Sequence, residues 1–328
     1  MKKTILEKIR KTLKNSRRVL ILCHVDPDGD TIGSSLGLYL ALTKIGCQPT
    51  IYSVDGVPRV YRFLPGADQI VTELAPDAHY DCAITVDASD LARLGNKIKL
   101  RELAKTVINI DHHPDNSRYG DINYVEPSPS VGVQIYHLCR FLKIKIDKNI
   151  ADNIYTAIIT DTGNFRYENT TGETFKIAAE LLRAGVKTHE LTSRIYDNRT
   201  LISIKVTALA MSRLQFTPDH KVCWSTLPEA GLNEIGVKGS ESIIGIVDLI
   251  RSVEGVEIAI LLREEKGKIK INFRAKSNIS VGAIARQFGG GGHAKAAGAI
   301  VVGELAEVTQ RVIAAAAKYL KAASYIVR

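Results

Sequence analysis

Aspartate and histidine residues gather in four short clusters, each of which directly follows an apolar stretch of the chain. The clusters span residues 24–30, 86–90, 109–114 and 160–164. Imidazole and carboxylate groups without a thiolate suit Mn²⁺ or Mg²⁺ better than a structural zinc site. Six or seven such ligands are too many for one ion and suit two, and a pair of ions can hold a hydroxide and clamp a phosphoryl group for in-line attack. The clusters therefore predict a two-metal hydrolytic centre.

Each cluster also has a purely structural interpretation. Residues 24–30 could form an aspartate-rich turn that caps a helix, residues 86–90 a common turn after a strand, and residues 160–164 a turn that ends a helix. The neighbouring pair His112 and His113 is uncommon at the end of a strand and offers imidazole ligands. The metal interpretation depends on all four clusters meeting at one place.

The elements between the clusters indicate how they could meet. Apolar runs predict strands at 19–23, 49–53, 82–86 and 107–110, and amphipathic patterns predict helices at 31–45, 131–142, 150–159 and 173–184. This alternation is typical of an α/β fold with a doubly wound, mostly parallel sheet and helices on both faces. Because ligands bind beyond the carboxyl ends of the strands in such sheets, we expect the clusters to lie at one edge.

The second half of the chain has a different pattern. Residues 188–214 are predicted to be largely helical, and we interpret them as a connection between two domains. After them the sequence predicts strands at 221–227, 256–263 and 269–274, and helices at 240–253, 280–288 and 304–319. The last two strands are separated by a short polar turn, which indicates a hairpin. Together these elements predict a smaller α+β domain.

Four consecutive glycines at 289–292 form a second candidate site. Such a run lets the backbone approach a ligand closely and present N–H groups to an anion, although it could also be a flexible loop. It is not a Walker loop, because Gly-Lys-Ser/Thr is absent. Arg274 precedes the run and could bind a phosphate in bidentate fashion or be a solvated charge on a strand.

The formal net charge of +9 is concentrated at the start of the chain. Residues 1–18 carry eight Lys or Arg and a single Glu, so the charge is a weak argument for nucleic-acid binding by the rest of the protein. Apolar residues at helical spacing, Ile5, Leu6, Ile9 and Leu13, predict an amphipathic helix that covers the first domain. A transit peptide is disfavoured, because a strand follows almost at once without a cleavage site.

Composition narrows the class of protein further. The hydrophobic fraction of 45% and the charged fraction of 24% exclude a disordered chain. No apolar run approaches the roughly 20 residues of a membrane span, which excludes an integral membrane protein. The five cysteines are single, with no CxxC pair and no signal peptide before them, and they indicate the reducing cytoplasm.

In order and spacing, the four clusters resemble the motifs of the DHH phosphoesterase family. The matching residues are His24, Asp28, Asp30, Asp87, Asp111, His112, His113 and Asp161. Residues 273–277 and 288–298 are similar to the DHHA1 domain, and the overall length is most similar to the NrnA-type nanoRNases, also described as pAp phosphatases. The resemblance implies a DHH metal-binding domain at 1–187, a helical linker at 188–214 and a DHHA1 nucleotide-binding domain at 215–328.

The resemblance also implies a role for each site residue. One ion would be held by His24, Asp28 and Asp87. The other would be held by Asp30, Asp87, His112 and Asp161, so that Asp87 bridges the two. His113 would contact the scissile phosphate or assist proton transfer, and Asp111 would orient the histidine pair. The terminal nucleotide and its phosphate would be bound by Arg274, Ser277, Gly291, Gly292 and His293. The expected cofactors are two divalent ions, Mn²⁺ first and Mg²⁺ second.

The function that the resemblance implies is metal-dependent hydrolysis of phosphoester bonds in a cytoplasmic enzyme. Its substrates would be short oligoribonucleotides (nanoRNA) and 3′-phosphoadenosine 5′-phosphate (pAp), attacked by a hydroxide held between the two ions, and a cleft between the domains would limit substrate length. The resemblance allows a homodimer and implies no membrane partner.

Several other functions compete with this one. A cyclic-di-AMP or pApA phosphodiesterase could use the same site. A RecJ-type exonuclease is disfavoured because no further nucleic-acid domain is present, and a pyrophosphatase because its relatives lack the glycine–histidine loop. A nucleotide sensor without turnover belongs to a different class. The aromatic fraction of 6% and the full set of metal ligands argue against it.

Overall fold

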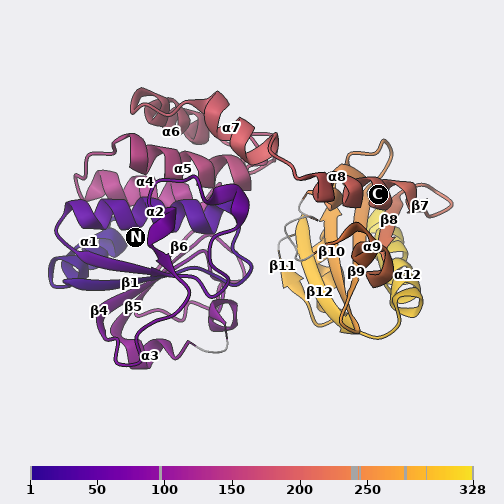
Figure 1. Ribbon diagram of the computed structural model, residues 1–328, viewed down its shortest axis with the longest axis horizontal. Helices are drawn as coiled ribbons and strands as arrows, with labels where there is room; N and C mark the ends of the chain where they lie inside the picture. The colour runs from indigo at the N-terminus through magenta and orange to yellow at the C-terminus, as the bar shows by residue number, and fades with distance from the viewer. Residues whose placement is uncertain are drawn as a thin grey trace. The chain divides into compact units, whose positions relative to one another are not determined.

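The computed structural model describes residues 2–95, 98–237, 243, 245–276, 279–292 and 294–326. The chain forms two compact units, Met1–Asn198 and Arg199–Arg328, each built on its own sheet (Figure 1). The division lies inside residues 188–214, the stretch interpreted from sequence as a helical linker. Helix α7 (Thr188–Tyr196) belongs to the first unit, and helix α8 (Leu201–Ser212) belongs to the second.

The first unit is an α/β unit whose sheet is parallel throughout, in the order β3-β2-β1-β4-β5-β6. Its strands are β1 Arg18–Leu22, β2 Gln48–Tyr52, β3 Ile70–Val71, β4 Tyr80–Val86, β5 Ala104–Asp111 and β6 Ile122–Val125. Its other helices are α1 Lys2–Lys14, α2 Gly29–Lys44, η1 Arg59–Tyr61, η2 Ala67–Gln69, η3 Leu91–Leu94, α3 Leu100–Leu103, α4 Val131–Phe141, α5 Lys148–Asp161 and α6 Gly172–Arg183. The predicted fold class is confirmed. Strands β3 and β6 were not predicted.

Alternate side chains of the central strands face two different layers. Ile21 and Ile84 pack in a large core with α1, α2, α4 and α5, while Leu20 and Ala83 face a smaller core that includes Leu100 of α3. The long helices therefore gather on one face of the sheet, and α3 lies at the other (Figure 1). Strands buried on both faces explain why the sequence reads as continuous apolar runs.

Helices α2 and α5 approach each other unusually closely. A Cβ atom built on Gly33 of α2 would lie 2.5 Å from the carbonyl oxygen of Asn153 and 2.9 Å from the amide nitrogen of Ala157, both backbone atoms of α5. Gly37 lies one turn further along α2. A Cβ on Gly37 would have one contact shorter than 3.4 Å, which is with the Ile154 side chain at 3.1 Å. Glycine at 33 thus sets the separation of the two helices that carry predicted metal ligands.

The N-terminal helix α1 is amphipathic, as the sequence predicts. Its buried side chains, Leu6, Ile9 and Leu13, join the larger core of the first unit. Its lysines and arginines are mostly exposed, and Lys2 forms an ion pair with Glu126 at 2.6 Å. The concentration of positive charge therefore belongs to a covering helix of the first unit.

The second unit is built on a mixed sheet in the order β11-β12-β10-β9-β8-β7, in which only β8 and β9 pair in parallel among the described strands. Its strands are β7 Gln215–Phe216, β8 Val222–Leu227, β9 Ile258–Glu265, β10 Lys268–Ala275, β11 Gly291–Gly292 and β12 Ala296–Val302. Its helices after α8 are α9 Glu229–Ile235, α10 Ile246–Arg251, α11 Val281–Arg286 and α12 Leu305–Ile326. The predicted hairpin of β9 and β10 is confirmed. The helix expected at 240–253 is described only as α10, because 240–242 and 244 lie outside the described residues.

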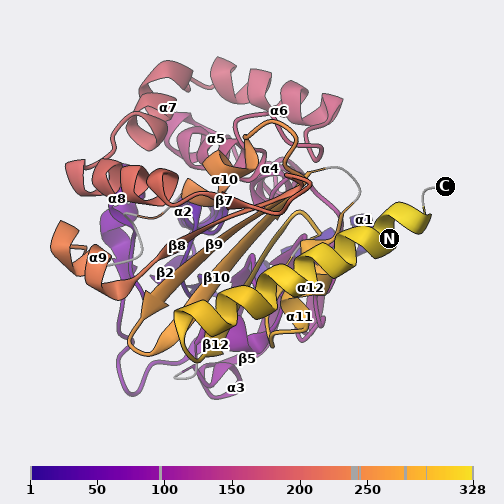
Figure 2. The same ribbon diagram turned by 90° about the vertical axis from the view of Figure 1, so that its right-hand side faces the viewer.

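Helices cover both faces of the second sheet. Helices α11 and α12 pack on one face with Phe273 and Ile260, and Figure 2 shows α12 lying along the sheet. Helices α8, α9 and α10 pack on the other face with Leu261 and Cys223. Strand β12, which was not predicted from the sequence, closes one side of the sheet together with β11.

Two further sequence expectations concern the whole chain. All five cysteines are buried and free, and Cys23 and Cys82 lie in the core of the first unit. In the described part of the chain, no helix combines the length and the apolar character needed to cross a membrane.

Candidate active site

The predicted metal ligands lie at one edge of the first sheet, where β1, β4 and β5 end. His24 follows β1, Asp87 follows β4, and His112 follows β5. Asp87 has a left-handed backbone with φ of 60°, a conformation that costs a non-glycine residue of order 1 kcal/mol or more and persists where surrounding contacts enforce it. Its amide donates to the Ile110 carbonyl oxygen at 3.0 Å, which ties the turn after β4 to the end of β5.

One group of ligand atoms consists of His24, Asp28 and Asp87, with one atom of each within 4.8 Å of the others. The Nε2 atom of His24 lies 3.5 Å from Asp87 Oδ2 and 3.8 Å from Asp28 Oδ1. Asp28 also caps α2, because its carboxylate accepts a hydrogen bond from the Thr31 amide. The structural interpretation of this cluster is therefore confirmed, and the geometry is compatible with the metal interpretation as well. These three residues are the set expected to hold one ion.

A second group consists of Asp30, His112 and Asp161, again with ligand atoms within 4.8 Å. His112 Nε2 lies 3.5 Å from Asp87 Oδ1 and 3.9 Å from Asp30 Oδ2, so that Asp87 lies next to both groups. Asp161 is the last residue of α5. A carboxylate at the C-terminus of a helix faces the negative end of the helix dipole, and a cation beside it offsets that cost.

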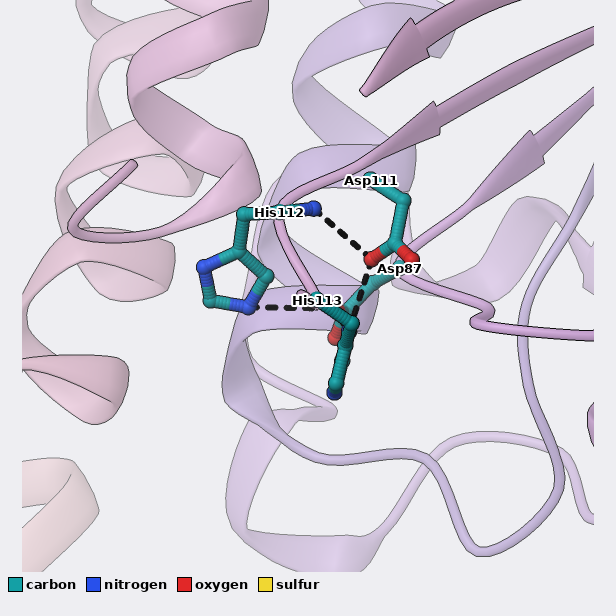
Figure 3. Close-up of side chains that lie close together, drawn as sticks. All are labelled: Asp87, Asp111, His112 and His113. Atoms are coloured by element: carbon teal, nitrogen blue, oxygen red, sulfur yellow. Dashed lines mark hydrogen bonds and ion pairs between the residues drawn. The ribbon is translucent and has the colours of Figure 1, made fainter. Parts of the chain in front are cut away.

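Asp111 is completely buried and holds the histidine pair in place. Its Oδ1 accepts hydrogen bonds from the His112 amide at 2.8 Å and from His113 Nδ1 at 2.7 Å (Figure 3). Its Oδ2 accepts from the Asn116 side-chain amide. This bond fixes the orientation of the His113 ring through Nδ1. These bonds are compatible with the orienting role predicted for Asp111, which stays a prediction.

Asp30 is fixed by a helix from a distant part of the sequence. Its carboxylate accepts hydrogen bonds from the amides of Val131 at 2.7 Å and Gly132 at 3.1 Å, the first two residues of α4, and from Ser34 Oγ at 2.9 Å. Helix N-termini favour negative charge, since their first amides lack partners within the helix. The side chain of Asp30 thus serves both the ligand group and the start of α4.

One oxygen of Asp87 indicates that these ligand groups can hold divalent cations. Asp87 Oδ2 accepts a hydrogen bond from Thr31 Oγ1 at 2.8 Å, but Asp87 Oδ1 is buried and has no hydrogen-bond partner within the described part of the chain. A buried carboxylate oxygen without a partner is costly. Since imidazole nitrogens and further carboxylates surround it, a cation is the partner that satisfies it. The residues present can therefore hold metal ions.

Burial and the close approach of charged side chains shift the pKa values of these histidines and aspartates. Burial lowers the pKa of His24, but contacts with Asp28 and Asp87 outweigh burial and raise it to about 10. Burial raises the pKa of Asp87, yet His112 and His24 hold it well below its usual range. Burial and the charge of Asp87 raise the pKa of Asp30 well above its usual range. Without metal, imidazolium groups supply the balancing positive charge.

The residues expected to bind nucleotide lie in the second unit. Arg274 is on β10, where its Nε donates to Asp248 Oδ1 at 3.2 Å, and Gly291 and Gly292 form the exposed strand β11. Ser277 and His293 lie outside the described residues. Their predicted roles stay predictions.

The glycine run at 289–292 also has a structural role within the second unit. A Cβ on Gly290 would lie 2.0 Å from the carbonyl oxygen of Gly298, so the backbone of the run packs directly against β12. This close packing is a further reason for glycine at position 290, and it is not visible in the sequence.

Several residues around the site were missed by sequence reasoning. The side chains of Thr31 and Ser34 donate hydrogen bonds to predicted metal ligands, Asp87 and Asp30 respectively. The sequence hinted at this role only through their position at the start of a helix that follows an acidic cluster. Arg93 of η3 lies with its Nη2 atom 3.1 Å from His24 Nδ1, and nothing in its sequence neighbourhood indicated this.

Comparison with known proteins agrees with this geometry. The family model described as the DHH family, N-terminal domain, matches residues 18–158, and the DHHA1 domain model matches residues 233–322. The bifunctional oligoribonuclease and PAP phosphatase NrnA of Thermus thermophilus is 37% identical, over 94% of this chain and 92% of that protein. The protein of the same name from Bacillus subtilis is 28% identical, over 86% and 89%.

A solved structure has the same fold over nearly its whole length. The crystal structure of an exopolyphosphatase-related protein from Bacteroides fragilis superposes with a TM-score of 0.89 and 25% identity, covering 97% of this chain and 96% of that one.

Proposed function

This chain belongs to the DHH family and carries a DHHA1 domain, and from that premise we propose that it is a hydrolase of phosphoester bonds. Its substrates are short oligoribonucleotides, which it cleaves to mononucleotides, and 3′-phosphoadenosine 5′-phosphate, from which it releases phosphate. The observation that carries the proposal is the buried Asp87 carboxylate. Its Oδ1 has no hydrogen-bond partner among the described residues and lies 3.5 Å from His112 Nε2 and 3.6 Å from His113 Nδ1.

The named relatives support this choice of substrates. The Thermus and Bacillus proteins are both named as bifunctional oligoribonucleases and PAP phosphatases, and the match to each extends over most of both chains. Every ligand position quoted for the DHH motifs is filled in this chain. A nucleotide-binding sensor without turnover would not require the complete set.

The proposed cofactors are two divalent ions, Mn²⁺ in preference to Mg²⁺. One is held by His24, Asp28 and Asp87. The other is held by Asp30, Asp87, His112 and Asp161. Imidazole and carboxylate ligands without thiolate favour these metals over structural zinc. Bound ions of this kind lower the pKa of water and offset the negative charge of a phosphoryl group during hydrolysis.

The protein's own side chains position the reacting groups. Asp111 accepts a hydrogen bond from Nδ1–H of His113 and so orients this partly exposed ring, whose Nε2 contacts the scissile phosphate or transfers a proton. Thr31 fixes the orientation of Asp87, and the amides of Val131 and Gly132 fix that of Asp30. In the DHHA1 domain, Arg274 and the glycine backbone bind the terminal nucleotide, together with Ser277 and His293.

We place the enzyme in the cytoplasm, since all five cysteines are free and free thiols persist in a reducing compartment.

The test is release of phosphate from pAp and of mononucleotide from a diribonucleotide, measured with Mn²⁺ and with EDTA. The wild-type chain should turn over both substrates with Mn²⁺ and neither with EDTA. Asp87→Asn keeps the shape of the side chain and removes its charge, and it should reduce kcat/KM by roughly a hundredfold or more. Near wild-type turnover of this variant would refute the metal assignment.

A matched control lies on the loop that follows β5. Asp115 is exposed and belongs to none of the ligand groups. Asp115→Asn should therefore leave kcat/KM within about twofold of the wild type. Absence of turnover by the wild-type chain, with Mn²⁺ shown to be bound, would favour the sensor.

A further inference from the structure

Arg93 is a cation at the edge of a strongly acidic site. It lies in η3, directly after β4, and its side chain is partly buried. Its Nη2 atom is 3.1 Å from Nδ1 of His24, the ring whose other nitrogen faces Asp28 and Asp87. Among the described residues, none of the ion pairs involves Arg93, and it makes no contact with a carboxylate through its side chain.

The contact with His24 cannot satisfy the guanidinium group. Nδ1 of His24 also lies 2.7 Å from the carbonyl oxygen of Val25, which can only accept a hydrogen bond. A ring nitrogen either donates or accepts, so Nδ1 bonds to Val25 or to Arg93, but not to both. When Nε2 of His24 is a metal ligand, Nδ1 carries the hydrogen and donates to Val25. Among the described residues, the Arg93 side chain then has no hydrogen-bond acceptor.

The backbone holds Arg93 in this position from both sides. Its amide donates to Asp90 Oδ1 at 3.1 Å, which caps η3, and its carbonyl oxygen accepts from the Val25 amide at 2.7 Å. The turn after β4 is thereby fixed to the turn after β1. The guanidinium group is held beside the ligand group of His24, Asp28 and Asp87, and only its side-chain torsions are free to adjust.

We propose that Arg93 binds a non-bridging oxygen of the substrate phosphate beside the ion held by His24. This inference rests on the proposed function and adds to it a residue that binds the substrate. A substrate phosphate brings the acceptor that the guanidinium lacks, and Arg–phosphate hydrogen bonds are among the stronger ones in proteins because both groups are charged. Removing one such contact should cost about 10- to 100-fold in affinity.

The decisive experiment is a cycle that changes both partners of the contact. Binding of a diribonucleotide and of its uncharged methylphosphonate analogue is measured by calorimetry, with Ca²⁺ in place of Mn²⁺ to prevent turnover. In the wild type, the methylphosphonate should bind at least tenfold less tightly than the phosphodiester. In Arg93→Gln the difference between the two ligands should shrink by about tenfold or more, because the side chain that distinguishes them is gone.

Two further variants separate substrate binding from support of the metal site. Arg93→Lys keeps the charge but not the planar pair of donors, and its affinity for the phosphodiester should be intermediate. Arg183, exposed in the last turn of α6, provides a matched control, and Arg183→Gln should bind like the wild type. The Mn²⁺ affinity of all three variants should stay within about threefold of the wild type.

The possible outcomes divide clearly. An equal loss of affinity for both ligands in Arg93→Gln, or a matching loss of Mn²⁺ affinity, would show that Arg93 supports His24 rather than binding phosphate, and would overturn the inference. If the wild type cleaved both substrates and Arg93→Gln bound the two ligands as the wild type does, the inference would be overturned while the proposed function would stand. A wild type that neither binds nor cleaves the nucleotides would overturn the proposed function as well.

Discussion

The close contact of α2 with α5 offers a sharp test of how the fold positions the site. We expect Gly33→Ala to destabilise the first unit and Gly37→Ala to leave it as stable as the wild type or slightly more so. Both substitutions gain about 1 kcal/mol of intrinsic helix propensity. They differ in what the new methyl group meets, namely backbone atoms of α5 at position 33 and a side chain at position 37.

The magnitude follows from the distances. At position 33 the new Cβ would be 2.5 Å from a carbonyl oxygen, and ordinary contact begins at 3.4 Å, so the helices must separate by roughly 1 Å. Overpacking of this kind costs about 1–3 kcal/mol. After the gain in propensity, Gly33→Ala should lower the free energy of unfolding by up to about 2 kcal/mol. For a unit of this size the midpoint of thermal unfolding would fall by roughly 4–8 °C.

The same displacement should weaken the metal site. Asp28 and Asp30 lie at the start of α2 and Asp161 at the end of α5, so separating the helices separates the ligand groups. A misplacement of about 1 Å can cost a hundredfold in activity. Urea unfolding and Mn²⁺ titration of the two variants provide the readouts. If Gly33→Ala unfolded at the same urea concentration as Gly37→Ala, the contact would not set the helix separation and the reasoning would be refuted.

Two more predictions concern the ligands themselves. Thr31→Val removes the donor to Asp87 without changing the volume of the side chain and should reduce Mn²⁺ affinity about tenfold. Thr31→Ser keeps the hydroxyl and should bind Mn²⁺ like the wild type. Equal Mn²⁺ affinities of the two variants in a calorimetric titration would contradict this role of Thr31. Mn²⁺ affinity should also rise with pH. The pKa of His24 in the metal-free protein is about 10, so at neutral pH its ring is protonated and must lose the proton to bind an ion. Each proton released makes binding about tenfold tighter per pH unit, and a dissociation constant that stayed level between pH 6.5 and 8.5 would be incompatible with a protonated His24.

Most of the first unit could be predicted because its strands are buried on both faces. The run 19–23 is apolar throughout and 82–86 is interrupted only by Thr85, and the structure places β1 and β4 within two residues of these runs. Strand β6 (Ile122–Val125) escaped prediction, because it is short and follows a polar segment. Strand β12 escaped because small residues, Ala296 to Ala299, lack the β-branched signal of a strand and gain their structure from pairing with β10.

The candidate site could be predicted only as far as side-chain chemistry is visible in the sequence. Ligand types and their position after strands identified Asp87 and His112. The amides of Val131 and Gly132 carry no such signal, since every residue has an amide and only the fold brings these two to Asp30, about a hundred positions away in the chain. Arg93 was missed for the same reason, because its partner is defined by the neighbouring turn and not by a pattern.

The double use of Asp30 bears on how such a protein can change over evolutionary time. Loss of His113 would remove a functional group while leaving the backbone amides around it satisfied, because its ring bonds to the Asp111 side chain. Loss of Asp30 would in addition leave two buried amides of α4 and the Ser34 hydroxyl without their acceptor. Homologues that have lost hydrolytic activity should therefore retain Asp30 longer than the other site residues. Its presence in a distant homologue is then evidence for an intact fold and not for enzymatic activity.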